Sequence, residues 1–264
     1  MKKIKYLALI LLMAFVASCK DEDNNSIIED KPLLPRKELR GVWMTTAWGI
    51  DWPMNDYNSV SQKKKYIDYL NFFKENNINA VFFQVRSMAD AFYDSQYESW
   101  SKNITGVAGK KPDYDVMNFL IDEAHKRGIQ FHAWLNPYRI STRPNATDTF
   151  PALDTKIPVE LVKDYKKIRI YNPALPEVQS RIQNIVKEIV TKYDVDGIHL
   201  DDYFYPALES GESMNDAVEY EQYGKGKFES VEDFRRENVN TVVKGIQQTI
   251  SAAHPNIVFS ISPA

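Results

Sequence analysis

The sequence predicts an α/β fold of the (β/α)8 TIM-barrel type, and the 264 residues of the chain contain about the first five strands of it. Five short apolar runs alternate with helix-like segments, and strands that alternate with helices form parallel sheets through right-handed crossovers. The connections after the runs are long, whereas those leading into the next run are short. This asymmetry is typical of barrels that carry functional loops at the carboxyl ends of their strands.

The predicted strands and helices follow one another along the chain from Leu39. The apolar runs expected as strands are 39–46, 80–87, 129–136, 196–203 and 257–262. The segments expected as helices are 61–76, 114–127, 176–193 and 231–253. Pro176 suits the first turn of the third helix, and the sequence HKRG at 125–128 suits the end of the second. A nucleotide-binding sheet is disfavoured, because no glycine-rich phosphate loop follows any of the strands.

The N-terminal segment differs in character from the rest of the chain. Residues 1–18 combine a basic start with an apolar run that is shorter than the roughly 20 residues needed to cross a membrane. We therefore expect a lipoprotein signal peptide. Cys19, the single cysteine of the chain, follows VAS as in a bacterial lipobox and is the expected lipidation site. Residues 19–37 are expected to form a flexible tether to a barrel domain at 38–264, which predicts export and lipid anchoring to the bacterial outer membrane.

The charge of the chain argues against nucleic acid as a partner. The formal net charge is −3, and removal of residues 1–18 takes away three lysines, which leaves 30 basic against 36 acidic residues. Proteins that bind nucleic acid are normally basic. The expected contact with the membrane is therefore the lipid and not a basic surface.

Near the carboxyl ends of the predicted strands, polar residues stand at every second position, which is here called the polar phase. Gln84 and Arg86 alternate with Phe83 and Val85, and the same pattern recurs in the third, fourth and fifth runs. Because alternate side chains of a strand point to opposite faces, the apolar phase should meet the helices and the polar phase should face the barrel axis. Asp201 would then point into the mouth of the barrel.

A carboxylate in a mouth lined by aromatic residues suits the binding of a sugar ring. The side chains expected to contact a sugar lie in the same runs or directly after them: Trp43, Gln84, Arg86, His132, Trp134, Asn136, Tyr138, Arg139, His199, Tyr203 and Tyr205. Glycoside cleavage generally needs two carboxyl groups, one acting as acid and one as base or nucleophile. The sequence therefore predicts a polysaccharide or oligosaccharide as the partner, and no metal or cofactor is expected.

Asp201 and Asp202 are the candidate catalytic residues. Asp201 is expected to act as nucleophile or charge stabiliser, with His199 one layer below it donating a hydrogen bond that keeps it ionised. The structural alternatives are an ion pair between Asp201 and Arg86 and a capping role for Asp202. Further candidates for the acid are carboxylates in the loop after the second strand: Asp90, Asp94 and Glu98.

Four segments resemble the glycosyl hydrolase-like 10 family: ELRGVWMTT, FFQVRSMADAFY, HAWLNPYR and DGIHLDDYFYP, the last at 196–206. The resemblance covers about residues 38–264. It implies a (β/α)8 barrel in an exported or lipid-anchored bacterial protein that hydrolyses a bacterial or environmental polysaccharide, with peptidoglycan glycan strands as one candidate. GIHLD is also similar in spacing to the fourth strand of amylase-type glycosidases, which places Asp201 in the role of the nucleophile.

The chain departs from the resemblance at its C-terminal end. An eight-stranded barrel needs three more strands than the five runs supply, so we expect a barrel that is truncated in this chain. The second catalytic acid would then lie beyond residue 264, and the chain alone would be inactive. Half a barrel would also expose two unpaired sheet edges, which predicts poor stability or self-association.

Two other functions fit the same residues. A non-catalytic glycan-binding lipoprotein would keep the aromatic mouth without a complete acid and base pair. A metal-dependent carbohydrate deacetylase is suggested by His199 close to Asp201 and Asp202. The other histidines, His125, His132 and His254, supply no H-x-x-x-H pattern for a metal.

Overall fold

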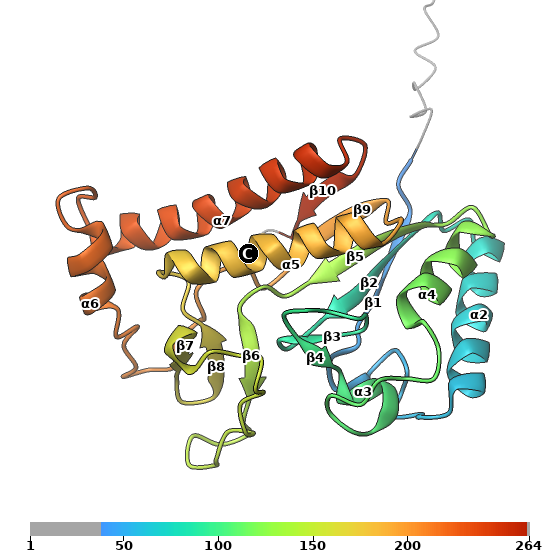
Figure 1. Cartoon of the computed structure of the whole chain (residues 1–264), viewed down its shortest axis with the longest axis horizontal. Helices are drawn as coiled ribbons and strands as arrows, with labels where there is room; N and C mark the ends of the chain where they lie inside the picture. Colours follow the sequence, from blue (N-terminus) through green and yellow to red (C-terminus); the bar gives the residue numbers. More distant parts are fainter. Residues whose placement is uncertain (1–37, 263–264) are drawn as a thin grey trace, which may run out of the picture. The chain divides into compact units, whose positions relative to one another are not determined.

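The apolar runs form one parallel sheet, which confirms the predicted fold class. The computed structural model describes residues 38–262, so the expected signal peptide, Cys19 and the tether lie outside the described residues. Within them, five parallel strands make up the central sheet in the order β1 (Gly41–Met44), β2 (Ala80–Arg86), β5 (Gln130–Leu135), β9 (Gly197–Leu200) and β10 (Val258–Ile261) (Figure 1). The order in the sheet follows the order in the chain, as in a (β/α) barrel.

Four long helices connect these strands, and each begins where the sequence supplies a suitable residue. They are α2 (Ser59–Glu75), α4 (Val116–His125), α5 (Pro176–Lys192) and α7 (Val231–Ala253). The side chains of Asn58, Asp115 and Ser230 accept hydrogen bonds from backbone N–H groups in the first turns of α2, α4 and α7. Helix α5 starts with Pro176. All four agree closely with the predicted ranges.

The long connections contain small elements of their own. The loop after β1 contains η1 (Ala47–Gly49). The loop after β2 contains β3 (Asp90–Ala91), β4 (Ser99–Trp100) and α3 (Lys102–Thr105). An antiparallel sheet of β6 (Arg139–Thr142), β8 (Ile168–Tyr171) and β7 (Val162–Asp164) follows β5, together with η2 (Val159–Leu161). The loop after β9 contains α6 (Ala217–Glu219) and η3 (Tyr220–Gly224).

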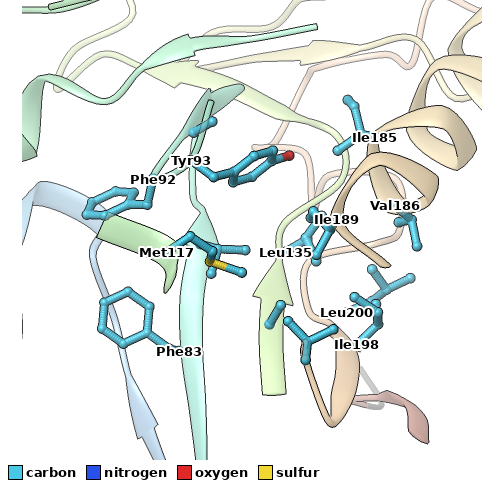
Figure 2. Packing of buried hydrophobic residues seen from close by; sticks show 14 of the residues in the cluster. Phe83, Phe92, Tyr93, Met117, Leu135, Ile185, Val186, Ile189, Ile198 and Leu200 are labelled. Carbon is cyan, nitrogen blue, oxygen red and sulfur yellow. The ribbon is translucent and has the colours of Figure 1, made fainter. Parts of the chain in front are cut away.

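The hydrophobic core lies between the helices and the apolar face of the central sheet. Phe83 of β2 and Ile198 of β9 belong to the same buried cluster as Met117 of α4 and Ile189 of α5 (Figure 2). The prediction that the apolar phase meets the helices is therefore confirmed. The opposite face of the sheet, away from the helices, is therefore the one available to the polar phase. Within residues 38–262, no helix is both long and apolar enough to cross a bilayer.

Candidate active site

The strand register brings the polar and aromatic residues of the second phase together in rows. Gln84, Trp134, His199 and Ser260 lie opposite one another on β2, β5, β9 and β10. Trp43 of β1 contacts two of these rings across the face, with centroid distances of 5.0 Å to Trp134 and 4.7 Å to His199. The face away from the helices is thus lined by indole and imidazole rings.

Gly197 makes room for this packing. A Cβ atom at Gly197 would lie 2.1 Å from Nδ1 of His132, closer than any real contact. The ring of His132 therefore occupies the space above β9, where it lies 4.7 Å from the ring of Phe82. Burial lowers the pKa of His132 below its usual value, so the face is lined by a neutral imidazole at pH 7.

Asp201 lies at the carboxyl end of β9, two residues after His199. Its backbone N–H donates to the carbonyl of Leu135 at 3.1 Å, which extends the pairing of β9 with β5 by one residue. Its Oδ1 accepts from the N–H of Asp202 at 2.8 Å, and the residue is half-buried. A carboxylate is therefore presented at the rim of the aromatic face, and its second oxygen is not held by that backbone contact.

Asp202 is held in an unusual conformation beside an arginine. Its φ of +54° is in the left-handed region, which is uncommon for a residue with a side chain. Its Oδ2 forms an ion pair with Nη2 of Arg139, and both side chains are only about one-fifth exposed. Burial raises the pKa of Asp202, the Arg139 guanidinium opposes this rise, and the Asp201 carboxylate adds to it. The two carboxyl groups thus differ in surroundings, as a pair with separate acid and base roles requires.

His199 makes a different hydrogen bond from the one expected. Its Nδ1 lies 2.7 Å from Oγ of Ser260 on β10, and its Nε2 is buried without a partner within residues 38–262. No hydrogen bond to Asp201 is found among the described residues. Burial lowers the pKa of His199, which Asp201 opposes, so a neutral ring lies below the carboxylate.

Arg86 does not share the mouth with Asp201, and its assignment to substrate binding is corrected here. The register shifts between Gln84 and Arg86, so Arg86 pairs with Leu135, a residue of the helix-side core. Such a bulge changes the face to which a side chain points. The guanidinium of Arg86 is fully buried and forms an ion pair with Glu98 through Nε at 2.7 Å and Nη2 at 2.5 Å. This pair also removes Glu98 from the candidate acids.

The side-chain oxygens of Gln84 and Asn136 are occupied by the fold. The Oε1 atom of Gln84 accepts from Thr45 Oγ1 at 2.7 Å and from the N–H groups of Thr46 and Ala47 at 3.0 and 2.9 Å. Oδ1 of Asn136 accepts from the indole N–H of Trp134 at 2.9 Å. Neither oxygen is therefore open to a sugar hydroxyl, and contact with a sugar through the two amide nitrogens stays a prediction.

The aromatic residues predicted to contact a sugar differ in accessibility. Trp43 is 42% exposed, whereas Trp134 and Tyr138 are buried. Tyr203 and Tyr205 are half-buried in the loop after β9, and the Tyr205 hydroxyl accepts from Nδ2 of Asn238 on α7 at 3.0 Å. Trp43 and the two tyrosines of this loop are therefore the aromatic residues best placed to meet a ligand.

The other loop carboxylates have local partners. Asp94 is exposed and lies 3.4 Å from Nζ of Lys111. Asp90 accepts from the N–H of Met88 at 3.1 Å. In the part of the chain that the structure describes, no group of three histidine, cysteine, aspartate or glutamate residues is arranged to hold a metal.

A parallel sheet with sequential strand order, connected by helices, defines a protein of the (β/α)-barrel class. A solved structure with a similar fold is that of alpha-L-fucosidase isoenzyme 2 from Paenibacillus thiaminolyticus, with a TM-score of 0.51 and 16% identity. The match covers 85% of this chain and 32% of that chain. At this level of identity, the similarity shows the fold.

The chain belongs to the glycosyl hydrolase-like 10 family, whose model matches residues 38–264. Glycosyl hydrolase YngK of Bacillus subtilis (strain 168) is 45% identical over 232 residues, which are 86% of this chain and 45% of the relative. Glycosyl hydrolase DigH of Escherichia coli (strain K12) is 35% identical over 281 residues, 97% of this chain and 64% of the relative. The chain thus spans less than two thirds of the length of either relative. The family and these names support a function of the glycoside hydrolase type.

Proposed function

We propose that the protein hydrolyses glycosidic bonds in a bacterial or environmental polysaccharide, with Asp201 as nucleophile or charge stabiliser. The position of Asp201 carries this proposal, because its half-buried carboxylate ends β9 beside the face that bears Trp43 and Trp134. Aromatic rings present large apolar surfaces on which the C–H groups of a sugar can pack. Membership of the glycosyl hydrolase-like 10 family supports the same reaction class.

Asp202 is the candidate for the general acid within this chain. A glycosidase needs one carboxyl group that keeps its proton and one that stays ionised. Burial raises the pKa of Asp202 and favours its protonated form, whereas the contact with Arg139 opposes this rise and fixes the position of the carboxyl group. Replacement of a general acid reduces the rate by about 10²–10⁴-fold.

The test is the release of reducing ends from peptidoglycan glycan strands and from a panel of neutral oligosaccharides. We expect the protein with a complete barrel to release reducing ends from at least one of them, and Asp201→Asn in that protein to abolish this release. Asp68→Asn is the matched control, because Asp68 is an exposed carboxylate on α2. Unchanged hydrolysis by Asp201→Asn would remove Asp201 from the mechanism, and glycan binding without hydrolysis would favour a non-catalytic binding protein.

We also propose that the protein is an exported lipoprotein anchored through Cys19. The support is the sequence alone, in which the single cysteine follows an apolar run and small residues. In cells that express the protein, Cys19→Ser is expected to abolish labelling by a palmitate analogue and to move the protein out of the membrane fraction. Retention of the label in Cys19→Ser would contradict the anchor.

A further inference from the structure

A pocket of about 280 Å³ lies among the loops that follow β1, β2 and β5. Its lining includes Trp48 from the first loop, Asp90 and Trp100 from the second, and Ser141 and Thr142 from β6. None of these residues belongs to the candidate active site. The volume is close to the lower limit of about 300 Å³ for small-molecule sites, which suits a single ring rather than a large cofactor.

Trp48 is an exposed residue in a loop whose backbone is held by hydrogen bonds. The residue is 57% exposed, and its φ of +52° is in the left-handed region. Its neighbours Ala47 and Gly49 are buried. Gln84 accepts three hydrogen bonds from this loop, and Nδ2 of Asn103 donates to the carbonyl of Thr46 at 2.9 Å. A costly conformation that the surroundings enforce, and that leaves an indole in solvent, points to a role outside the core.

Asp90 has hydrogen-bonding capacity for a ligand in the pocket. Both hydrogen bonds that hold Asp90 fall on its Oδ1, from the N–H of Met88 at 3.1 Å and from Ser87 Oγ at 3.3 Å. This leaves Oδ2 of Asp90 to accept from a ligand. Oγ of Ser141 has no hydrogen-bond partner within residues 38–262, but the atom is buried and is therefore closed to a ligand in the pocket.

The charges in the pocket favour a neutral, polar ligand. The carboxylates of Asp90 and Asp154 share the lining with the ammonium group of Lys102, so neither sign of charge dominates the pocket. Arg169, which also lines the pocket, is already paired with Asp164 through Nε at 2.6 Å and Nη2 at 2.8 Å. A purely apolar ligand would leave Oδ2 of Asp90 without a partner. A sugar ring provides hydroxyl groups for the polar atoms and a C–H face for an indole.

We propose that this pocket binds one neutral sugar residue of a polysaccharide, with the ring against Trp48 and its hydroxyl groups donating to Asp90. The inference rests on the proposed function and deepens it, because the chain would then hold its glycan at two places. Trp48 and Asp90 are specificity-determining residues in this arrangement, since neither lies with Asp201 and Asp202.

The five tryptophans of the chain allow the two places to be observed separately. The Asp201→Asn protein is labelled with 5-fluorotryptophan, and each ¹⁹F resonance is assigned by a Trp→Phe variant. Trp43 and Trp134 report on the candidate active site, Trp48 and Trp100 report on the pocket, and fully buried Trp52 is the internal reference. The probes are chitotetraose, cellotetraose and maltotetraose, each added at increasing concentration.

We expect at least one tetrasaccharide to shift the Trp48 and Trp100 resonances while that of Trp52 stays fixed. Trp48→Ala and Asp90→Asn should each weaken binding at the pocket by about tenfold, as followed by the Trp100 resonance. Asp90→Asn keeps the Oδ1 that accepts the two loop hydrogen bonds and replaces Oδ2 by an amide nitrogen. A loss of affinity in this variant therefore measures the contribution of Oδ2 to ligand binding. Phe72→Ala, at a 60% exposed position on α2, should change nothing. Because the ligand is neutral, the affinity should be the same at low and high salt.

The outcomes separate this inference from the proposed hydrolysis. Shifts at Trp48 and Trp100 in a protein that releases no reducing ends would support the pocket and contradict the proposed function. Shifts confined to Trp43 and Trp134, or no shift with any tetrasaccharide, would overturn the pocket. Affinity that is unchanged by both Trp48→Ala and Asp90→Asn would also overturn it.

Discussion

Asp201 and Asp202 are adjacent in the sequence, yet the structure gives them different surroundings. Asp201 accepts a backbone hydrogen bond at the end of β9, whereas Asp202 turns away through a positive φ and pairs with Arg139. A left-handed residue between strand and loop thus gives two neighbouring carboxylates different partners. At the scale of single residues, the proposed acid and base roles depend on this difference.

The Arg139 side chain allows the assignment of Asp202 as the acid to be tested through the pH dependence of activity. Arg139 opposes the rise in the pKa of Asp202 that burial causes, so Arg139→Gln should raise the pKa of Asp202 further. If Asp202 is the acid, activity falls as pH rises through this pKa, and the fall should move to higher pH in the variant. The measurement is the pH profile of kcat/KM, with the exposed Lys111→Gln as control. A fall that stays in place or moves to lower pH would contradict the assignment.

At the scale of elements, β2 is a strand whose last residue changes face. The register shift before Arg86 turns its guanidinium to the buried side, where it meets Glu98 from the loop ahead of β4. Both side chains are fully buried, so each charge depends on the other. The pair therefore fixes the loop after β2 to the end of the strand.

Removing one charge of this ion pair should reduce the free energy of unfolding far more than removing both charges. Arg86→Met leaves a buried carboxylate and should reduce the free energy of unfolding by about 3–5 kcal/mol. In Arg86→Met with Glu98→Gln, a substantial part of this loss should return. Urea denaturation of the two single variants and the double variant measures the coupling. Additive losses would show that the two side chains do not act as a pair.

The elements show where prediction from the sequence succeeds and where it stops. The strands and helices are predictable because their apolar residues recur with a clear period and the helices carry capping residues. Arg86 is misplaced because strict alternation cannot reveal a bulge. Gln84 lies on the predicted face, but the sequence does not reveal that its side-chain oxygen is occupied, because its partners, Thr45 to Ala47, come close only through the pairing of β1 with β2. The rim position of Asp201 follows from the strand pattern, whereas the Asp202 ion pair depends on where Arg139 of β6 is placed.

At the scale of the whole sheet, the two outer strands determine the behaviour of the chain in solution. Within residues 38–262, β1 pairs only with β2 and β10 pairs only with β9. Val258 and Ile261 of β10 are 50% and 41% exposed. A strand with unpaired backbone groups and exposed apolar side chains tends to pair with another chain.

We therefore expect the chain of 264 residues to self-associate in solution. Sedimentation velocity over a range of protein concentrations should show a mass that rises with concentration. Ile261→Lys should reduce this association, because a charge on an edge strand opposes pairing, whereas Val60→Lys on exposed α2 should not. A monodisperse monomer that unfolds cooperatively would contradict the expectation.

The loop after β1 has a consequence for protein engineering. Gln84 and Asn103 hold its backbone, while the indole at position 48 contributes little to the interior. The shape of the loop and the chemistry it displays are therefore set by different residues. A library randomised at position 48 alone could be screened for altered sugar preference with the scaffold left intact.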